Sequence, residues 1–81
     1  MTFTVEIADA KELSTNKHRV EIYLDKNNLE SLITRLKRLS KETVGEHIHL
    51  MSESWGLGDL DEKTHLSENV ITHHLKIILA E

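Results

Sequence analysis

The hydrophobic residues of this chain change their spacing twice, and this change constrains the fold more than any other feature. In residues 2–8 and 18–24 every second residue is apolar, which is typical of a half-buried β-strand. Residues 26–43 place leucine and isoleucine three or four positions apart, as in an amphipathic helix. Residues 47–52 and 70–79 return to alternation. The order β-β-α-β-β predicts an α+β fold in which a single helix packs on one face of a four-stranded, mainly antiparallel sheet.

The alternation also assigns faces to the later strands. In residues 47–52, Ile48 and Leu50 share one face, and the other face carries His47, His49 and Met51. In residues 70–79 we expect the apolar face to hold Ile71, His73, Leu75, Ile77 and Leu79. The polar face of the sheet would then bear Tyr23, His47, His49, Met51 and either His73 or His74. This face is a candidate binding surface.

The predicted helix has a start signal and a stop signal. Asp25 is placed to cap the first turn, and Gly45 can adopt a left-handed conformation just past the end. The outer surface carries a basic cluster, mostly in the C-terminal half, where cations complement the helix dipole. The cluster consists of Arg35, Lys37, Arg38 and Lys41. Nucleic-acid binding is the weaker interpretation of it, because no aromatic residues accompany these cations.

The length of 81 residues predicts a single domain over residues 1–81. Domains of this size often need disulfides or a metal ion for stability. The chain contains no cysteine, which excludes disulfides and thiolate zinc sites, whereas its six histidines leave an imidazole site open. No apolar run approaches the roughly 18 residues of a membrane span, and the N-terminus does not resemble a signal peptide. We therefore expect a cytoplasmic protein with no membrane contact.

The negative charge is concentrated in one segment. Residues 53–68 hold five acids and one lysine, which equals the net charge of −4 of the whole chain. Such a segment disfavours nucleic acid as a partner and favours a basic protein, although a solvated acidic loop is the simpler interpretation. The predicted loop over residues 53–69 is long for a small domain, and loops of this kind are usually functional or disordered.

The histidines offer an alternative chemistry. His47 and His49 point the same way on a strand, and antiparallel pairing with residues 70–79 would add His74. Three converging imidazoles would suit a zinc ion with an open fourth position, in a small metal-binding protein or hydrolase. A group of partly exposed structural histidines is the more common outcome. We therefore assign no catalytic residue, metal or cofactor.

Trp55, the single tryptophan, has two possible roles. It either covers the core beneath the long loop or serves as an exposed anchor at an interface, where tryptophan is frequent among hot spots. Gly56 and Gly58 give the backbone the freedom to form a tight turn beside it. An aromatic anchor within an acidic rim suits a basic protein partner. The predicted partner-binding residues are Trp55, Met51, Glu53, Asp59, Asp61 and Glu62.

The segment HIHLMSESWGLGDLDE, followed by NVITHHLKIIL, resembles the immunity protein 32 family of bacterial polymorphic toxin systems. The matching motifs are His49-Leu50-Met51, Ser54-Trp55-Gly56 with Leu60, and His74-Leu75-Lys76-Ile77, and the preceding leucine-faced helix also fits. The resemblance covers about the C-terminal two thirds of the chain. Leu57 between the two glycines departs from the small residues of the family pattern.

The resemblance implies a cytoplasmic antitoxin that binds and neutralises a cognate toxin and is not an enzyme. The toxin would be basic, and nucleases with basic clefts are the class that an acidic loop suits. We expect a monomer or a weak homodimer. A structural subunit that pairs with its own copies through an exposed strand edge is a third hypothesis.

Overall fold

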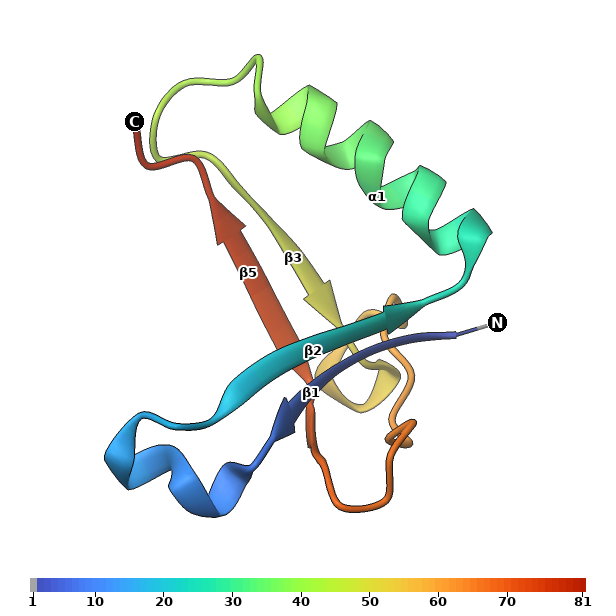
Figure 1. Cartoon of the computed structure of the whole chain (residues 1–81). Helices are drawn as coiled ribbons and strands as arrows, with labels where there is room; N and C mark the ends of the chain where they lie inside the picture. The colour runs from blue at the N-terminus through green and yellow to red at the C-terminus, as the bar shows by residue number, and fades with distance from the viewer. Residues whose placement is uncertain (1) are drawn as a thin grey trace.

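The computed structural model describes residues 2–81 and has an α+β fold, as the hydrophobic pattern predicts (Figure 1). Within the described residues it contains one α-helix, five strands and two short 3-10 helices. In chain order these are β1 (Phe3–Ala8), η1 (Ala10–Thr15), β2 (Arg19–Leu24), α1 (Lys26–Leu39), β3 (His47–Met51), η2 (Glu53–Trp55), β4 (Val70–Thr72) and β5 (His74–Ile78).

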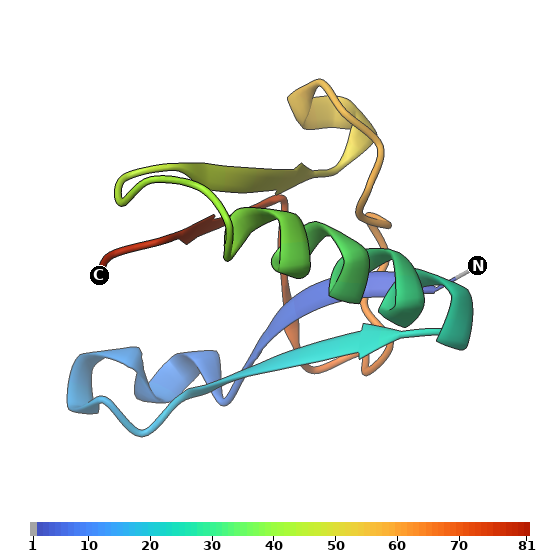
Figure 2. The same cartoon turned by 90° about the horizontal axis from the view of Figure 1, so that it is seen from above.

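The prediction of one four-stranded sheet is wrong, because the strands form two separate antiparallel sheets. One sheet has the order β2-β1-β4, and the other consists of β3 and β5. Figure 2 shows β1 and β2 on one side and β3 and β5 on the other, with α1 between them in that view. The predicted hairpin of the first two strands is confirmed, and it pairs Phe3 with Leu24 and Ala8 with Arg19 in an unbroken register.

The two sheets arise because the predicted strand over residues 70–79 breaks at His73. The backbone N–H of Ser52 donates to the carbonyl of His73 (2.9 Å), and the Ser52 hydroxyl lies 2.7 Å from its Nδ1. These bonds hold a bend, so β4 pairs with β1 and β5 pairs with β3. His73 is therefore not part of a continuous apolar strand face. Tyr23 lies on the three-stranded sheet, so it does not share a face with the histidines of β3.

The helix begins as predicted and ends earlier. The Asp25 carboxylate accepts a hydrogen bond from the N–H of Asn28 (2.8 Å), which confirms the N-cap. The helix ends at Leu39 rather than at residue 43, because the next residues are polar and exposed and the Ser40 hydroxyl bonds back to the carbonyl of Lys37. Gly45 has a positive φ of 98°, but it turns the chain into β3 and does not end the helix.

The core lies between the two sheets. Phe3, Val5, Leu50 and Leu60 form its buried centre, and three partly buried leucines pack against it: Leu24, Leu32 and Leu75. Leu60 belongs to the segment predicted as a long loop, and its burial ties that segment to the fold. No helix in the described part of the chain has both the length and the apolar character that crossing a bilayer requires.

Candidate functional site

A cluster of histidines lies on the outer face of the β3–β5 sheet. Pairing of Met51 with His74 brings His74 beside His49, as the alternation predicted. The ring centroids of His49 and His74 are 4.9 Å apart, and those of His47 and His49 are 4.6 Å apart with the rings edge to face. The three imidazoles that the sequence marks as an alternative metal site are therefore neighbours.

Their geometry does not form a metal site. The Nδ1 of His49 and the Nε2 of His74 are 2.7 Å apart, so these two nitrogens bond to each other and do not point toward a common centre. In residues 2–81 no group of three or more histidine or acidic side chains converges in a way that could hold a metal ion. Burial lowers the pKa of His49, and the neighbouring His47, His74 and Lys76 lower it further. The lowered pKa of His49 reflects the cost of placing a second positive charge in this partly buried cluster.

Trp55 lies beside this cluster and is exposed. Of its surface, 58% remains accessible, and 54% of Leu57 does, so Trp55 does not cover the core. The indole stacks nearly parallel to His73, with centroids 6.1 Å apart and an angle of 7° between the planes, and its centroid is 6.2 Å from that of His74. The result is an aromatic surface that joins η2 to the histidine face and presents a large apolar ring to solvent.

Hydrogen bonds to Ser52 and Glu62 hold the turn that carries Trp55. Ser52 is fully buried, and its carbonyl accepts the N–H of Trp55 (3.0 Å). Gly56 ends η2 with a φ of 113°, a conformation that favours glycine. The Glu62 carboxylate accepts the N–H of Ser54 (3.2 Å) and lies 3.7 Å from Nδ1 of His73. Hydrogen bonding from Ser54 lowers the pKa of Glu62 and outweighs the opposing effect of its partial burial. These bonds fix the turn from which the indole projects.

Two of the predicted partner-binding acids are used in the fold. Asp59 lies 3.4 Å from the guanidinium of Arg35 and accepts the N–H of Met51 (3.2 Å). Asp61 accepts the N–H of Phe3 (2.8 Å) and donates its own N–H to the carbonyl of that residue (2.7 Å). Glu53 is exposed, and its carboxylate has no hydrogen-bond or ion-pair partner among residues 2–81. Fewer acidic side chains are therefore free around Trp55 than the number of acids in the segment suggests.

Ser52, His73 and Glu62 resemble a nucleophile, base and acid in type but not in arrangement. In a catalytic triad the serine and the acid contact opposite nitrogens of the imidazole. Here the Ser52 hydroxyl and the Glu62 carboxylate both lie nearest to Nδ1 of His73. Ser52 is also completely buried, which places its hydroxyl out of reach of a substrate. The three residues form a structural clamp.

A second polar cluster was not predicted. Glu6 is fully buried, and its carboxylate accepts hydrogen bonds from the Thr4 hydroxyl, the N–H of His65 (2.8 Å) and the amide of Asn69 (2.9 Å). The same amide bonds to Glu21, the residue opposite Glu6 on β2 (3.1 Å). Alternation gives no indication of this role, because it places Glu6 on the polar face of β1. Only the return of residues 65–69 to that face buries it.

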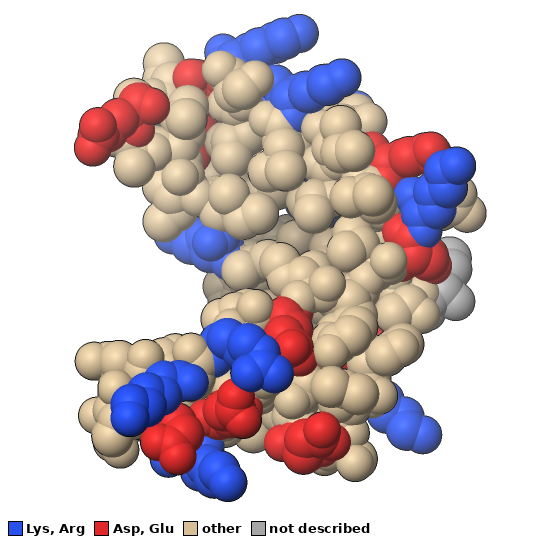
Figure 3. All heavy atoms as spheres, viewed as in Figure 1, with Lys and Arg blue, Asp and Glu red and all other residues tan. Residues whose placement is uncertain are grey.

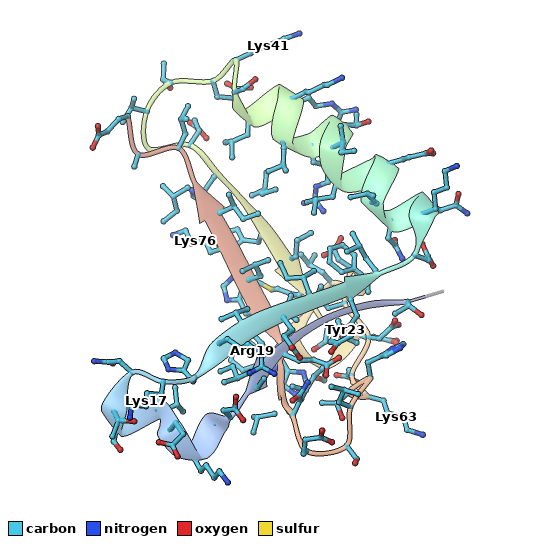
Figure 4. All side chains as sticks on the ribbon, viewed as in Figure 1. Lys17, Arg19, Tyr23, Lys41, Lys63 and Lys76 are labelled. Carbon is cyan, nitrogen blue, oxygen red and sulfur yellow. The ribbon has the colours of Figure 1, made fainter. Side chains whose placement is uncertain are left out.

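Two side chains from β2 complete this second cluster (Figure 4). The Tyr23 hydroxyl donates to Glu21 (2.9 Å), and its ring stacks on His65 with centroids 4.7 Å apart. Arg19 bonds to Glu21 (3.0 Å) and to Asp9 (2.6 Å). Nearly all these polar groups satisfy one another, so the cluster anchors the 62–69 segment and leaves little to offer a ligand.

Comparisons of the chain with protein families, with curated proteins and with solved structures found no match.

Proposed function

We propose that this protein is an immunity protein that binds a basic toxin domain through the surface formed by Trp55, Leu57 and the outer face of β3–β5. The observation that carries the proposal is the exposure of an anchored tryptophan. The indole of Trp55 leaves a large apolar area in contact with water and is not part of the core. Tryptophan rings of this kind are common hot spots of protein interfaces. The resemblance of this segment to the immunity protein 32 family supports the same function.

Preorganisation supports this role for Trp55. The ring stacks on His73, and the turn beneath it is fixed by Ser52 and Glu62. A partner would therefore pay little conformational entropy for ordering the anchor, which favours affinity. The neighbouring Leu57 extends the exposed apolar area.

Charge supports a basic partner, with a revised set of residues. Glu53 and Glu62 flank the indole, and Glu68 is also exposed in the same segment. Asp59 contributes less, because the guanidinium of Arg35 neutralises it, whereas Asp61 and Glu62 are exposed and keep their charge although each accepts a backbone hydrogen bond. We assign attraction of the partner mainly to the glutamates and Asp61, and contact to Trp55, Leu57 and Met51. Inhibition would follow from covering the toxin's active site or a surface beside it.

The experiment compares capture of a partner by three forms of the protein. The wild-type chain, Trp55→Ala and the control Val44→Ala are immobilised and exposed to lysate of the source organism. Val44 is equally exposed but lies between α1 and β3, outside the proposed surface. We expect the wild type and the control to retain the same basic protein. Trp55→Ala should bind it at least about 30-fold more weakly, since truncation of a hot spot costs on the order of 2 kcal/mol or more.

Circular dichroism of each variant separates loss of binding from loss of folding. Because Trp55 is mostly exposed, Trp55→Ala should melt within a few degrees of the wild type. Equal capture by Trp55→Ala and wild type would contradict the proposed surface. Captured proteins without toxicity would contradict the immunity function itself.

A further inference from the structure

The strand β2 is an unprotected sheet edge. It is the end strand of its sheet, and its register with β1 runs through six residue pairs without a bulge. The N–H of Asp25 donates to the carbonyl of Thr2, in the residue pair that follows Phe3–Leu24. In an antiparallel ladder only every second residue of a strand bonds to the neighbouring strand, so this bond identifies which residues of β2 face β1. It follows that the N–H and C=O groups of Val20, Ile22 and Leu24 point away from β1. Proteins usually protect such an edge with charged side chains, proline or a bulge; β2 has no proline, lysine or bulge, and its two charged side chains, Arg19 and Glu21, pair with each other.

The apolar face beside this edge is also uncovered. Val20 is 58% exposed and Ile22 is 44% exposed, although both share a sheet face with the buried Val5 and Phe3. On α1 three further apolar side chains are each more than a third exposed: Leu29, Ile33 and Leu36. Figure 3 shows a hollow on the side of the molecule where β5 lies above β2 and η1. Edge and face together form a surface without an intramolecular partner among the described residues.

The edge strand is complementary to itself. Two copies of β2 can pair antiparallel about a two-fold axis that passes between two equivalent residues, which form the centre of the pairing. If at least five residues of each strand are to pair, this central residue is either Ile22 or Glu21. A centre on Glu21 places two carboxylates opposite each other, which is destabilising. A centre on Ile22 sets Val20 opposite Leu24 of the other copy and Glu21 opposite Tyr23.

We propose that the protein forms a two-fold symmetric dimer in which two β2 strands pair about Ile22 and join the three-stranded sheets into one of six strands. A two-fold axis perpendicular to the sheet keeps both apolar faces on the same side. The pairing satisfies the outward N–H and C=O groups and covers Val20 and Ile22 in both copies. The surface shares no residue with the Trp55 surface, so the proposal stands or falls independently of toxin binding.

Disulfide trapping tests the register directly, because the chain contains no native cysteine. In the proposed dimer the two Ile22 Cα atoms face each other at about 5.5 Å, within the range that a disulfide spans. The two Glu21 Cα atoms are diagonal, about 7–8 Å apart. After mild oxidation, Ile22→Cys should give a covalent dimer in high yield. Glu21→Cys and the surface control Val44→Cys should remain largely monomeric.

A yield from Ile22→Cys, which keeps Glu21, no higher than that from Val44→Cys would overturn the proposed register, and so would faster cross-linking of Tyr23→Cys, whose two copies are also diagonal. Equal cross-linking of all these variants would show collision only and would overturn the proposal as well.

Sedimentation equilibrium measures the same association without a covalent bond. The wild type should show reversible dimerisation as its concentration rises, and Ile22→Lys should raise the dissociation constant roughly tenfold or more by placing a charge at the centre of the paired strands. Val44→Lys is the control and should leave the constant unchanged. A wild type that stays monomeric up to millimolar concentration, or a folded Ile22→Lys that dimerises like the wild type, would refute the dimer.

Discussion

Glu6 carries a carboxylate without any exposed surface, on a strand face that alternation assigns to polar residues. Burial alone would raise its pKa, but hydrogen bonds from Thr4, the His65 backbone, Asn69 and the Leu66 backbone outweigh burial and hold the pKa below its ordinary value. The charge is therefore stable in the fold because four donors replace water. These donors come from β1 and from the 62–69 segment, so one residue secures the end of the long loop.

We predict that Glu6→Gln destabilises the protein by roughly 3 kcal/mol, since hydrogen bonds to a charged acceptor contribute more than neutral ones and an amide leaves a buried donor unsatisfied. Urea unfolding measures the change. Glu30→Gln, an exposed residue on α1, is the control and should alter the free energy of unfolding by less than about 0.5 kcal/mol. A loss at Glu6 no larger than at Glu30 would show that the network contributes little.

At the scale of single elements, α1 shows how a local signal operates. The Asp25 carboxylate accepts the N–H groups of Asn28 and Thr2, each at 2.8 Å, and so caps the helix and ties it to the start of β1. Hydrogen bonds from the backbone of Asn28 and Thr2 lower its pKa. Capping of this kind depends on residues close in sequence, which is why the helix start can be predicted and the fold around it cannot.

For Asp25→Ala we expect a loss of about 1 kcal/mol in the free energy of unfolding, the usual cost of removing an N-cap, and more if the Thr2 bond adds to it. Chemical denaturation of Asn27→Ala, an exposed position in the first turn, provides the comparison. An effect of Asp25→Ala equal to that control would mean that the cap observed in the structure does not stabilise the helix.

The β3–β5 element has a pH dependence that follows from its histidines. The pKa of His49 lies below its ordinary value of 6.5 because of burial and the neighbouring His47, His74 and Lys76. The unfolded chain therefore binds the His49 proton more readily than the folded chain. The resulting stability is present above pH 6.5 and is lost as the pH falls through the folded-state pKa.

Thermal melts between pH 7.5 and pH 5 should therefore show a falling midpoint below about pH 6.5. His49→Gln should reduce the slope, because it removes the titrating group. The range stays above the ordinary glutamate value of 4.5, so the lowered pKa values of Glu6, Glu21 and Glu62 contribute only a small part at its acidic end. An identical slope in His49→Gln would assign the pH dependence to other groups.

At the scale of the whole molecule, the sequence predicts the elements better than their assembly. The two periods are local, so residues 18–24 and 26–43 already indicate β2 and α1. The division into two sheets depends on the bend at His73, which Ser52 holds across 21 positions, and no pattern within residues 70–79 reveals it. The burial of Leu60 likewise results from a parallel bridge between Leu60 and Ser52 and from packing against Phe3 and Leu50.

In the candidate site, too, local features can be predicted from the sequence and contacts between distant segments cannot. Met51, Glu53 and Trp55 are close in sequence, so the strand and the turn bring them together as predicted. The stacking of Trp55 on His73 and the pairing of Asp59 with Arg35 depend on distant segments, and these contacts decide which residues remain available to a partner. The sequence therefore predicts the local cluster around Trp55, whereas the ion pair that neutralises Asp59 depends on a distant residue.

The central claim is that the Trp55 surface neutralises a toxin, and a growth assay tests it most directly. The basic protein captured by the wild type is expressed in a sensitive host, alone or together with the wild-type chain, Trp55→Ala or Val44→Ala. We expect the captured protein to arrest growth, the wild type and Val44→Ala to restore it, and folded Trp55→Ala to restore it far less. Growth in the absence of the wild-type chain, or equal rescue by Trp55→Ala, would contradict this claim.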